Sequence, residues 1–387
     1  MLKQAPTALA QTRRLRFAKQ LLDETSLPIT EVALASGFGS VRQFNDVFKR
    51  IYRRSPREMR KAGVRRSADA EIRLRLTYRP PYDWESVNRF LARRALQGVE
   101  CVESGYYSRT VRTATGHVII RVKPAADADA LELSIQGGEA PDLLPVSSAA
   151  RRMFDLSADP ARIARVLKVD PLLRGLVMRR PGLRIAGTWD LFESGVRAIV
   201  GQAITVGAGR TIVGRLVGCA GRRIAAEGQG LTHLFPAPDA IIAADLQAVG
   251  LPRTRAEALR AFARAVQQGA IDPHGTTEQL VEVLSALPGV GPWTAGYVVL
   301  RGLGEPDGFP SGDLILKRQA GSAGVPLTAR ELDARAERWR PFRGYAVLHL
   351  WEAAAVEITG VLAPALQRGE DFVVSPVVGR RQRRQAV

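Results

Sequence analysis

The chain has 387 residues, 46% of them hydrophobic, so it is long enough to build two or three packed domains. Its formal net charge of +18 favours a polyanionic partner. Nucleic acid is favoured over a membrane surface because no apolar run approaches the roughly 18–20 residues of a spanning helix. Two cysteines are too few for a four-cysteine iron–sulfur or zinc site, and the four histidines show no ligand spacing. We therefore expect no metal cofactor and a reducing, cytoplasmic compartment.

The first segment, residues 1–66, contains 15 Lys/Arg against 5 Asp/Glu and so carries over half of the net charge. Apolar residues at helical spacing predict a first helix, and residues 29–35 predict a second helix that Gly37 ends. Residues 40–43, SVRQ, have the form of a capping box and begin a third helix. Two short helices separated by a glycine turn predict a helix-turn-helix. Three exposed polar residues of its second helix are expected to contact DNA: Arg42, Gln43 and Asn45.

The sequence pattern changes in residues 71–146, which predict a small α/β domain with an antiparallel sheet. Residues 84–96 resemble a helix packed on that sheet, and three stretches predict strands: Ile72–Leu76, Val118–Val122 and Leu131–Ile135. Helical periodicity dominates residues 147–368. Residues 369–387 form a basic tail without apolar periodicity, which we expect to be disordered. The predicted fold class is therefore α+β, with most of the chain helical.

A short glycine-rich link stands out in the helical part of the chain. Residues 287–295, LPGVGPWTA, join two helical stretches through a link too short for anything but a tight hairpin. Gly289 and Gly291 permit positive φ and let the backbone approach another molecule closely. Pro292 suits the first turn of the second helix, whose unpaired N–H groups point at an anion. Such a turn alone is more often structural, but in a strongly basic chain this pattern favours phosphate binding without base readout.

Residues 287–295 resemble the helix-hairpin-helix of the DNA glycosylase superfamily, in which a Gly/Pro-rich loop leads to a catalytic aspartate. Asp313 lies 22 positions after Gly291, as that pattern expects. Other stretches are similar to one branch, the alkylbase glycosylases related to 3-methyladenine DNA glycosylase II. Together they run in the expected order from Ile72 to Ala363. These stretches are residues 76–84 (LTYRPPYDW), 195–202 (GVRAIVGQ), 339–346 (WRPFRGYA) and 348–351 (LHLW).

The resemblance implies a base-excision repair enzyme that flips alkylated purines of the 3-methyladenine type from duplex DNA and hydrolyses the N-glycosidic bond. That cleavage builds positive charge on the sugar, which the carboxylate of Asp313 would stabilise. An ordinary helix N-cap is the alternative interpretation of Asp313. The resemblance also implies an aromatic pocket that attracts the cationic base by cation–π interaction, although each ring could instead be a core residue. The pocket residues are Trp351, Trp293, Tyr297 and Phe90.

The hairpin itself carries two further expectations from the resemblance. Gly289, Gly291 and Thr294 contact the DNA backbone, and a monovalent cation can bind at the hairpin. Relatives that also nick the backbone use a lysine in the helix after the hairpin to form a Schiff base. Trp293 occupies that position here and has no amine. The expected reaction is therefore base release alone, which leaves an abasic site.

One position departs from the resembling glycosylases, in which a bulky apolar wedge follows the glutamine of the central helix and fills the gap left by the flipped base. In this chain Gln202 is followed by Ala203 and then Ile204. Either Ile204 or Gln202 takes over the role of the wedge, or the flipped state is held less firmly, so the intercalating residue remains open among these three. The departure affects the expected efficiency on well-stacked damage and leaves the reaction class unchanged.

Residues 43–49 and 55–58 resemble the second helix-turn-helix of AraC-type transcription regulators. Such regulators usually carry two of these units, whereas one and part of a joining helix are visible here. The metal-binding methyl-acceptor domain that accompanies such units in adaptive-response proteins is not seen, nor are its cysteines. The segment is either a remnant, or the chain starts downstream of the true start of a longer gene.

Two competing interpretations remain. An AraC-type transcription regulator with a non-catalytic DNA-binding C-terminal domain predicts that Asp313 is dispensable. A non-specific DNA-binding protein would bind DNA in a salt-sensitive way and release no base. Under all three interpretations the partner is double-stranded DNA. We expect a monomer with no membrane association.

Overall fold

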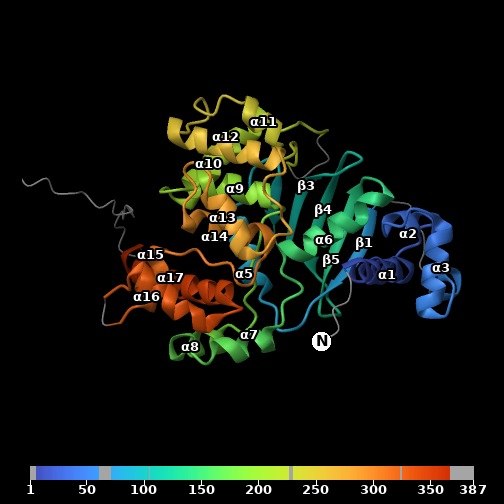
Figure 1. Ribbon diagram of the computed structural model, residues 1–387, viewed down its shortest axis with the longest axis horizontal. Coiled ribbons are helices and arrows are strands. Elements are labelled where there is room, and N and C mark those ends of the chain that lie inside the picture. Colours follow the sequence, from blue (N-terminus) through green and yellow to red (C-terminus); the bar gives the residue numbers. More distant parts are fainter. Residues whose placement is uncertain (1–5, 61–70, 104, 226–229, 323–324, 367–387) are drawn as a thin grey trace, which may run out of the picture.

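Four helices make up the N-terminal part of the molecule, and they include the expected helix-turn-helix (Figure 1). The computed structural model describes residues 6–60, 71–103, 105–225, 230–322 and 325–366. Gly37, with a φ of +76°, forms the turn between the second and third helices. The hydroxyl of Ser40 accepts the N–H of Gln43 at 3.1 Å, so Ser40 caps the third helix as expected. The helices are α1 (Pro6–Glu24), α2 (Ile29–Ala35), α3 (Val41–Tyr52) and α4 (Pro56–Met59).

A five-stranded antiparallel sheet follows, with the strand order β1-β5-β4-β3-β2. Three strands coincide with the predicted ones, and the helix α5 (Trp84–Ala92) begins where expected but ends four residues earlier. Register is set by pairs such as Leu74 with Leu133 and Ile120 with Ile135, whose side chains are all buried. The strands are β1 (Glu71–Thr77), β2 (Glu100–Glu103), β3 (Tyr106–Arg112), β4 (His117–Pro124) and β5 (Ala130–Gly137).

The sequence did not predict β2 and β3, and the reason lies in their buried polar side chains. In β3, Ser108, Arg109 and Thr110 are all buried, so the strand lacks the usual alternation of apolar and polar residues. Arg109 is 1% exposed, and only a partner distant in the sequence makes that burial possible. The strand β2 has four residues and is too short to carry a period-two signal.

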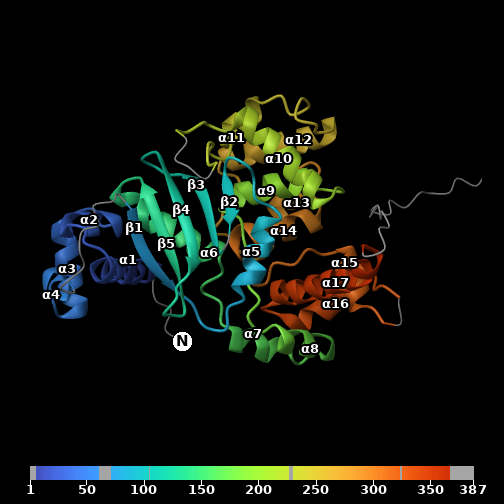
Figure 2. The same ribbon diagram turned by 180° about the vertical axis from the view of Figure 1, so that it is seen from behind.

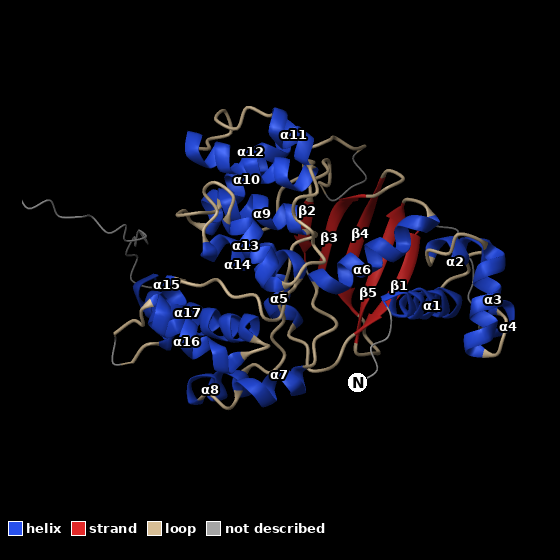
Figure 3. Cartoon of the chain, in the orientation of Figure 1, coloured by secondary structure: helices blue, strands red, loops and turns tan. Residues whose placement is uncertain are grey.

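The remainder of the described chain is almost wholly helical (Figure 3). The helix α6 (Leu143–Met153) lies over the sheet and begins before residue 147, where the sequence suggested the domain boundary. Residues 61–66 and the predicted tail, 369–387, lie outside the described residues. The further elements are η1 (Ala140–Asp142), α7 (Pro160–Leu167), α8 (Pro171–Arg179), α9 (Leu191–Val200), α10 (Val206–Ala220), α11 (Pro238–Ala243), α12 (Arg253–Gln267), α13 (Thr277–Ser285), α14 (Pro292–Leu303), α15 (Leu314–Ala320), α16 (Ala329–Ala336), η2 (Glu337–Trp339) and α17 (Arg343–Leu366).

Three apolar cores hold the molecule together. The first joins the helix-turn-helix, the sheet and α6. The second is built from α9 to α14, and the third from α7, α8 and α15 to α17. The helix α14 belongs to both helical lobes, because Val299 packs in the second core and Leu300 in the third. The first turn of α14 follows the glycine-rich hairpin, so the predicted site lies where the two lobes meet.

Candidate active site and DNA interface

Asp313 lies at the junction of the two helical lobes and is held by three N–H donors. Its side chain caps α15, where Oδ1 accepts the N–H of Leu316 at 2.9 Å. The indole of Trp293 donates to Oδ2 at 2.7 Å, and the indole of Trp351 donates to Oδ1 at 3.3 Å. The aspartate is 7% exposed. Asp313 is therefore a helix N-cap, but two indoles from separate helices also fix the direction of its carboxylate.

Three aromatic side chains lie beside this carboxylate. Trp293 and Tyr297, one turn apart on α14, stack with ring centroids 5.3 Å apart and an interplanar angle of 17°. Trp351 of α17 meets Tyr297 at 6.2 Å and 48°. All three rings are partly buried, and Tyr297 and Trp351 also pack against the second and third cores respectively. The structure thus brings together Asp313 and three of the four predicted pocket residues.

Phe90, the fourth predicted pocket residue, joins this group through an arginine. The guanidinium of Arg301 lies 4.2 Å from the ring centroid of Phe90 and 5.5 Å from that of Trp351. A second guanidinium, that of Arg94, lies 3.9 Å from the Phe90 centroid. Cations of the protein itself therefore already contact two of the rings expected to attract a cationic base.

Arg94 and Arg301 were not predicted from the sequence. Arg301 is 5% exposed and donates to the carbonyl of Ala186 at 2.7 Å, while its Nε has no hydrogen-bond partner. Burial lowers the pKa of Arg301 to about 10, so the side chain stays charged at neutral pH. Burial alone would raise the pKa of Tyr297, but Arg94 and Arg301 outweigh that effect and lower it. The helical spacing of Trp293, Tyr297 and Arg301 was the one sequence signal that could have identified Arg301.

The predicted phosphate-binding hairpin lies between α13 and α14 and has the expected backbone. Gly289 has a φ of +72°, and a Cβ atom there would stand 2.9 Å from the Cβ of Ala258, so the position requires glycine. Gly291 is the N-cap of α14 and is exposed, and Pro292 begins the helix. The first turn of α14 therefore presents N–H groups without intrahelical partners to solvent. Thr294 is 3% exposed, and its hydroxyl accepts a hydrogen bond from the side-chain amide of Gln202.

The predicted intercalating residues form the turn between α9 and α10. Gln202 turns back to the hairpin, where its Nε2 donates to the carbonyl of Gly289 and to the hydroxyl of Thr294, both at 2.9 Å. Ala203 is exposed with a φ of +57°, a left-handed conformation at the tip of the turn. Ile204 is partly buried and lies near Gly209 of α10. The turn and the hairpin are thus one connected surface.

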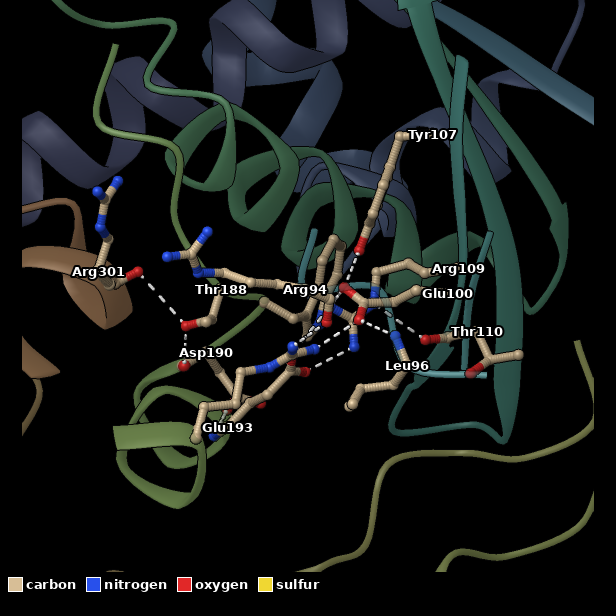
Figure 4. Close-up of polar contacts among 12 residues, drawn as sticks. Arg94, Leu96, Glu100, Tyr107, Arg109, Thr110, Thr188, Asp190, Glu193 and Arg301 are labelled. Carbon is tan, nitrogen blue, oxygen red and sulfur yellow. Dashed lines mark hydrogen bonds and ion pairs between the residues drawn. The ribbon is translucent and has the colours of Figure 1, made fainter. Parts of the chain in front are cut away.

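A buried charge network joins the sheet to α9, which carries this turn (Figure 4). Arg109 of β3 pairs with Glu193 at 2.7 Å, and Arg197 of α9 pairs with Glu100 of β2 at 2.6 Å. The hydroxyl of Tyr107 also donates to Glu100, at 2.7 Å. Burial would raise the pKa of Glu193, but the two arginines outweigh it and lower the pKa to about 2. Glu193 is therefore the partner that allows Arg109 to be buried.

The helix-turn-helix residues predicted to contact DNA lie on the solvent side of α3. Arg42, Gln43 and Asn45 are exposed, while Phe44 and Phe48 of the same helix are buried. The sheet separates α3 from the helical lobes that contain α14 and α15 (Figures 1 and 2).

No group of His, Cys, Asp and Glu that could hold a metal ion occurs among the residues described by the structure. The hairpin offers carbonyl oxygens instead: those of Leu287 and Gly289 each accept one hydrogen bond and keep a second lone pair. Oxygen donors of this kind fit a hard cation. Within the described ranges, none of the helices has the length and apolar character needed to span a membrane.

The fold and this site define a helix-hairpin-helix DNA glycosylase. Residues 73–190 match the family of the AlkA N-terminal domain, and residues 2–62 match a helix-turn-helix domain family. The chain is 38% identical over 353 residues to the "Probable bifunctional transcriptional activator/DNA repair enzyme AlkA" of Mycobacterium tuberculosis, covering 89% of this chain and 71% of that protein. It is 34% identical to "DNA-3-methyladenine glycosylase 2" of Escherichia coli, covering 71% of this chain and 95% of that protein. The chain belongs to the AlkA family of DNA-3-methyladenine glycosylases.

The architecture is also that of solved structures. The 3-methyladenine DNA glycosylase from Archaeoglobus fulgidus superposes with a TM-score of 0.62 at 24% identity, over 72% of this chain and 96% of that one. At this level of identity the likeness concerns the fold, and it confirms the predicted α+β class with its helix-hairpin-helix part.

Proposed function

We propose that this protein is a monofunctional DNA glycosylase of base-excision repair, which releases alkylated purines of the 3-methyladenine type from duplex DNA. One observation carries the proposal: a carboxylate, Asp313, is held by the indoles of Trp293 and Trp351, which lie beside the ring of Tyr297 and close to the glycine-rich hairpin. A transcription regulator or a passive DNA-binding module has no need for this arrangement.

Recognition begins at the backbone of the DNA. The hairpin at Gly289 and Gly291 binds a phosphate through backbone N–H groups, and the turn around Ala203 enters the duplex as the damaged nucleotide leaves the stack. Because Gln202 links turn and hairpin, phosphate binding and intercalation take place on one rigid surface. We further propose that a monovalent cation binds to the hairpin carbonyls when DNA is bound.

Bond cleavage takes place at the carboxylate. As the glycosidic bond breaks, positive charge develops on the sugar, and the fixed negative charge of Asp313 stabilises it in a site that DNA closes to water. The alkylated purine is already cationic and leaves without a strong acid. A water molecule completes the reaction at the sugar. No amine stands at position 293, so the product is an abasic site in an unbroken strand.

Base release from methylated duplex DNA by the intact protein and by Asp313→Asn tests this proposal. Asparagine is as good an N-cap as aspartate, so the substitution removes the charge and keeps the cap. We expect the variant to release the base about 100-fold more slowly or slower still. It should still bind DNA that contains an abasic site. Asp159→Asn is a matched control, since Asp159 caps α7 in the same way and is not part of the site. Equal release by Asp313→Asn would favour the regulator, and DNA binding without release by either protein would favour the passive module.

DNA is the partner in this proposal, and one chain is sufficient for it, because all groups that act on the base come from the same chain. The cytoplasmic location expected from the two unpaired cysteines remains a prediction.

A further inference from the structure

The helix-turn-helix is attached to the rest of the molecule by more than its covalent link. The carboxylate of Glu24 accepts the N–H of Arg75 in β1 at 2.8 Å, and the amide of Gln20 donates to the carbonyl of Arg75 at 2.8 Å. The two α1 side chains also bond to each other, at 2.9 Å. They occupy backbone groups on the free edge of β1, an edge that would otherwise be open to pairing. The shared apolar core of α1, α2 and the sheet makes the attachment rigid.

The two potential DNA-binding surfaces lie on opposite edges of the sheet. The helix-turn-helix packs at β1, whereas α9 is joined to β2 and β3 at the other edge through Glu100 and Arg109. Five strands at about 4.8 Å spacing put the two edges about 19 Å apart. Both views show α3 on one side of the sheet and α9, α13 and α14 on the other (Figures 1 and 2).

The exposed surface of α3 and α4 is suited to a polyanion. From Arg42 to Glu58 it presents six cations and two carboxylates, Asp46 and Glu58, and all of these side chains are exposed. The buried side of α3 is taken up by Phe44, Val47 and Phe48. The exposed side is therefore free to enter a groove of DNA, as the second helix of a helix-turn-helix does. The six cations are Arg42, Lys49, Arg50, Arg53, Arg54 and Arg57.

A single duplex cannot easily bind to both surfaces at the same time. A straight duplex on the hairpin would have to pass around the sheet to reach α3. Bending a site of 20–30 base pairs by 40–90° already costs about 1–6 kcal/mol, and passing to the opposite side requires a larger bend. Two separate duplexes require no such deformation.

We propose that one copy of this protein binds two DNA duplexes at once, a damaged one at the hairpin and an undamaged one at α3. The second duplex is held through charge and shape rather than by the chemistry of damage. It keeps the enzyme near other DNA when the damaged strand is released, because binding at one surface raises the effective concentration at the other. For the damaged duplex the proposal rests on the proposed function, and for the undamaged duplex it rests on the exposed, cationic surface of α3.

The mass of the complex tests this directly. The intact protein is mixed with a short duplex that carries an abasic-site analogue and a second, undamaged duplex of different length, and the species are counted by mass photometry. We expect a complex of one chain with both duplexes. Substitution of Lys49, Arg50 and Arg54 by alanine should reduce this species at least tenfold, while base release from a short duplex stays within twofold. Removal of three exposed cations elsewhere, Lys168, Arg330 and Arg338, is the matched control and should leave it in place.

Three outcomes would overturn the inference. One is a complex of two chains with two duplexes, which assigns the bridging to a dimer. Another is a species with one duplex only. The third is an equal loss of the two-duplex complex in the control variant, which would show that the effect depends on net charge alone. The mass measurement is independent of catalysis, since the duplex with the abasic-site analogue has no base to release. A protein that bridges but releases no base refutes the proposed function alone, and one that releases base without bridging refutes this inference alone.

Discussion

Gln202, in the turn after α9, and Thr294, in the first turn of α14, are joined by a hydrogen bond of 2.9 Å although they lie 92 residues apart in the sequence. The same amide also donates to the carbonyl of Gly289. The turn proposed to enter the duplex and the hairpin proposed to bind a phosphate are therefore held in one geometry. This pre-organisation avoids an ordering cost on binding.

Gln202→Ala should therefore weaken the coupling between intercalation and phosphate binding. We expect kcat/KM for base release from duplex DNA to fall about tenfold, because two hydrogen bonds of about 0.5–1.5 kcal/mol each are lost. Steady-state rates on duplex substrates measure this effect. Gln268→Ala, an exposed glutamine outside the site, is the control. Unchanged kcat/KM would mean that the turn holds its position without the amide.

Ala203→Leu should increase the rate on well-stacked damage. Ala203 sits exposed at the tip of the turn, and a leucine there fills the gap of the flipped base better than a methyl group does. Alanine and leucine carry a similar strain at a φ of +57°, so folding stability should change little. We expect a several-fold faster single-turnover release. Ala203→Gly relieves the strain and adds no wedge, and a similar gain from it would contradict the explanation.

The two indoles that donate to Asp313 should contribute unequally to the rate of base release. Replacement by phenylalanine keeps a ring and removes the N–H. The bond from Trp293 is 2.7 Å long and that from Trp351 is 3.3 Å, so Trp293→Phe should lower the single-turnover rate more. A charge-assisted hydrogen bond of about 1.5–3 kcal/mol corresponds to a loss of about 10- to 100-fold for Trp293→Phe. The reverse order would show that ring contact, and not the direction of the carboxylate, dominates.

Arg94 should influence which bases are released. Its guanidinium covers the ring of Phe90 and lies near Tyr297, so it repels a cationic base in the pocket. Arg94→Gln should raise the release of 7-methylguanine relative to neutral hypoxanthine by about tenfold, the effect of about 1.4 kcal/mol of like-charge repulsion. Competition between the two lesions in one reaction measures the ratio. A ratio that falls or stays constant would exclude Arg94 from base selection.

His349 should make the protein less stable in mild acid. It is 5% exposed in α17, and burial, with Arg180 nearby, lowers its pKa from 6.5 to about 4. The folded protein thus resists protonation of this side chain, and the stability that follows is present above pH 6.5 and is lost as the pH falls towards 4. A shift of this size corresponds to about 3 kcal/mol.

Urea unfolding at several pH values, compared between the intact protein and His349→Leu, isolates this contribution. The difference in the free energy of unfolding between the two proteins should change between pH 6.5 and 4 and remain flat above pH 7. The comparison cancels Asp155, whose burial raises its pKa to about 6 and which acts in the opposite direction. A difference that is independent of pH would show that His349 is not the titrating group.

The sequence by itself determined the elements whose signal is local. The turn at Gly37, the capping by Ser40, the strands β1, β4 and β5, and the hairpin between α13 and α14 all follow from spacing, glycine and capping patterns, and the structure has each of them. These features could be predicted because the residues that decide them lie within a few positions of one another. Asp313, 22 positions after Gly291, was instead identified by the resemblance to the superfamily pattern.

Contacts between segments that lie far apart in the sequence were decided only by the tertiary structure. Arg109 is buried because Glu193 reaches it from α9, and this pairing hid β3 from a search for alternating strands. The placement of Arg94 and Arg301 against the aromatic rings, and the bond of Gln202 to the hairpin, depend on helices that meet only in the folded chain. Burial of a charge or an amide becomes favourable only when its partner is in place, and a partner about 90 residues away leaves no local pattern in the sequence.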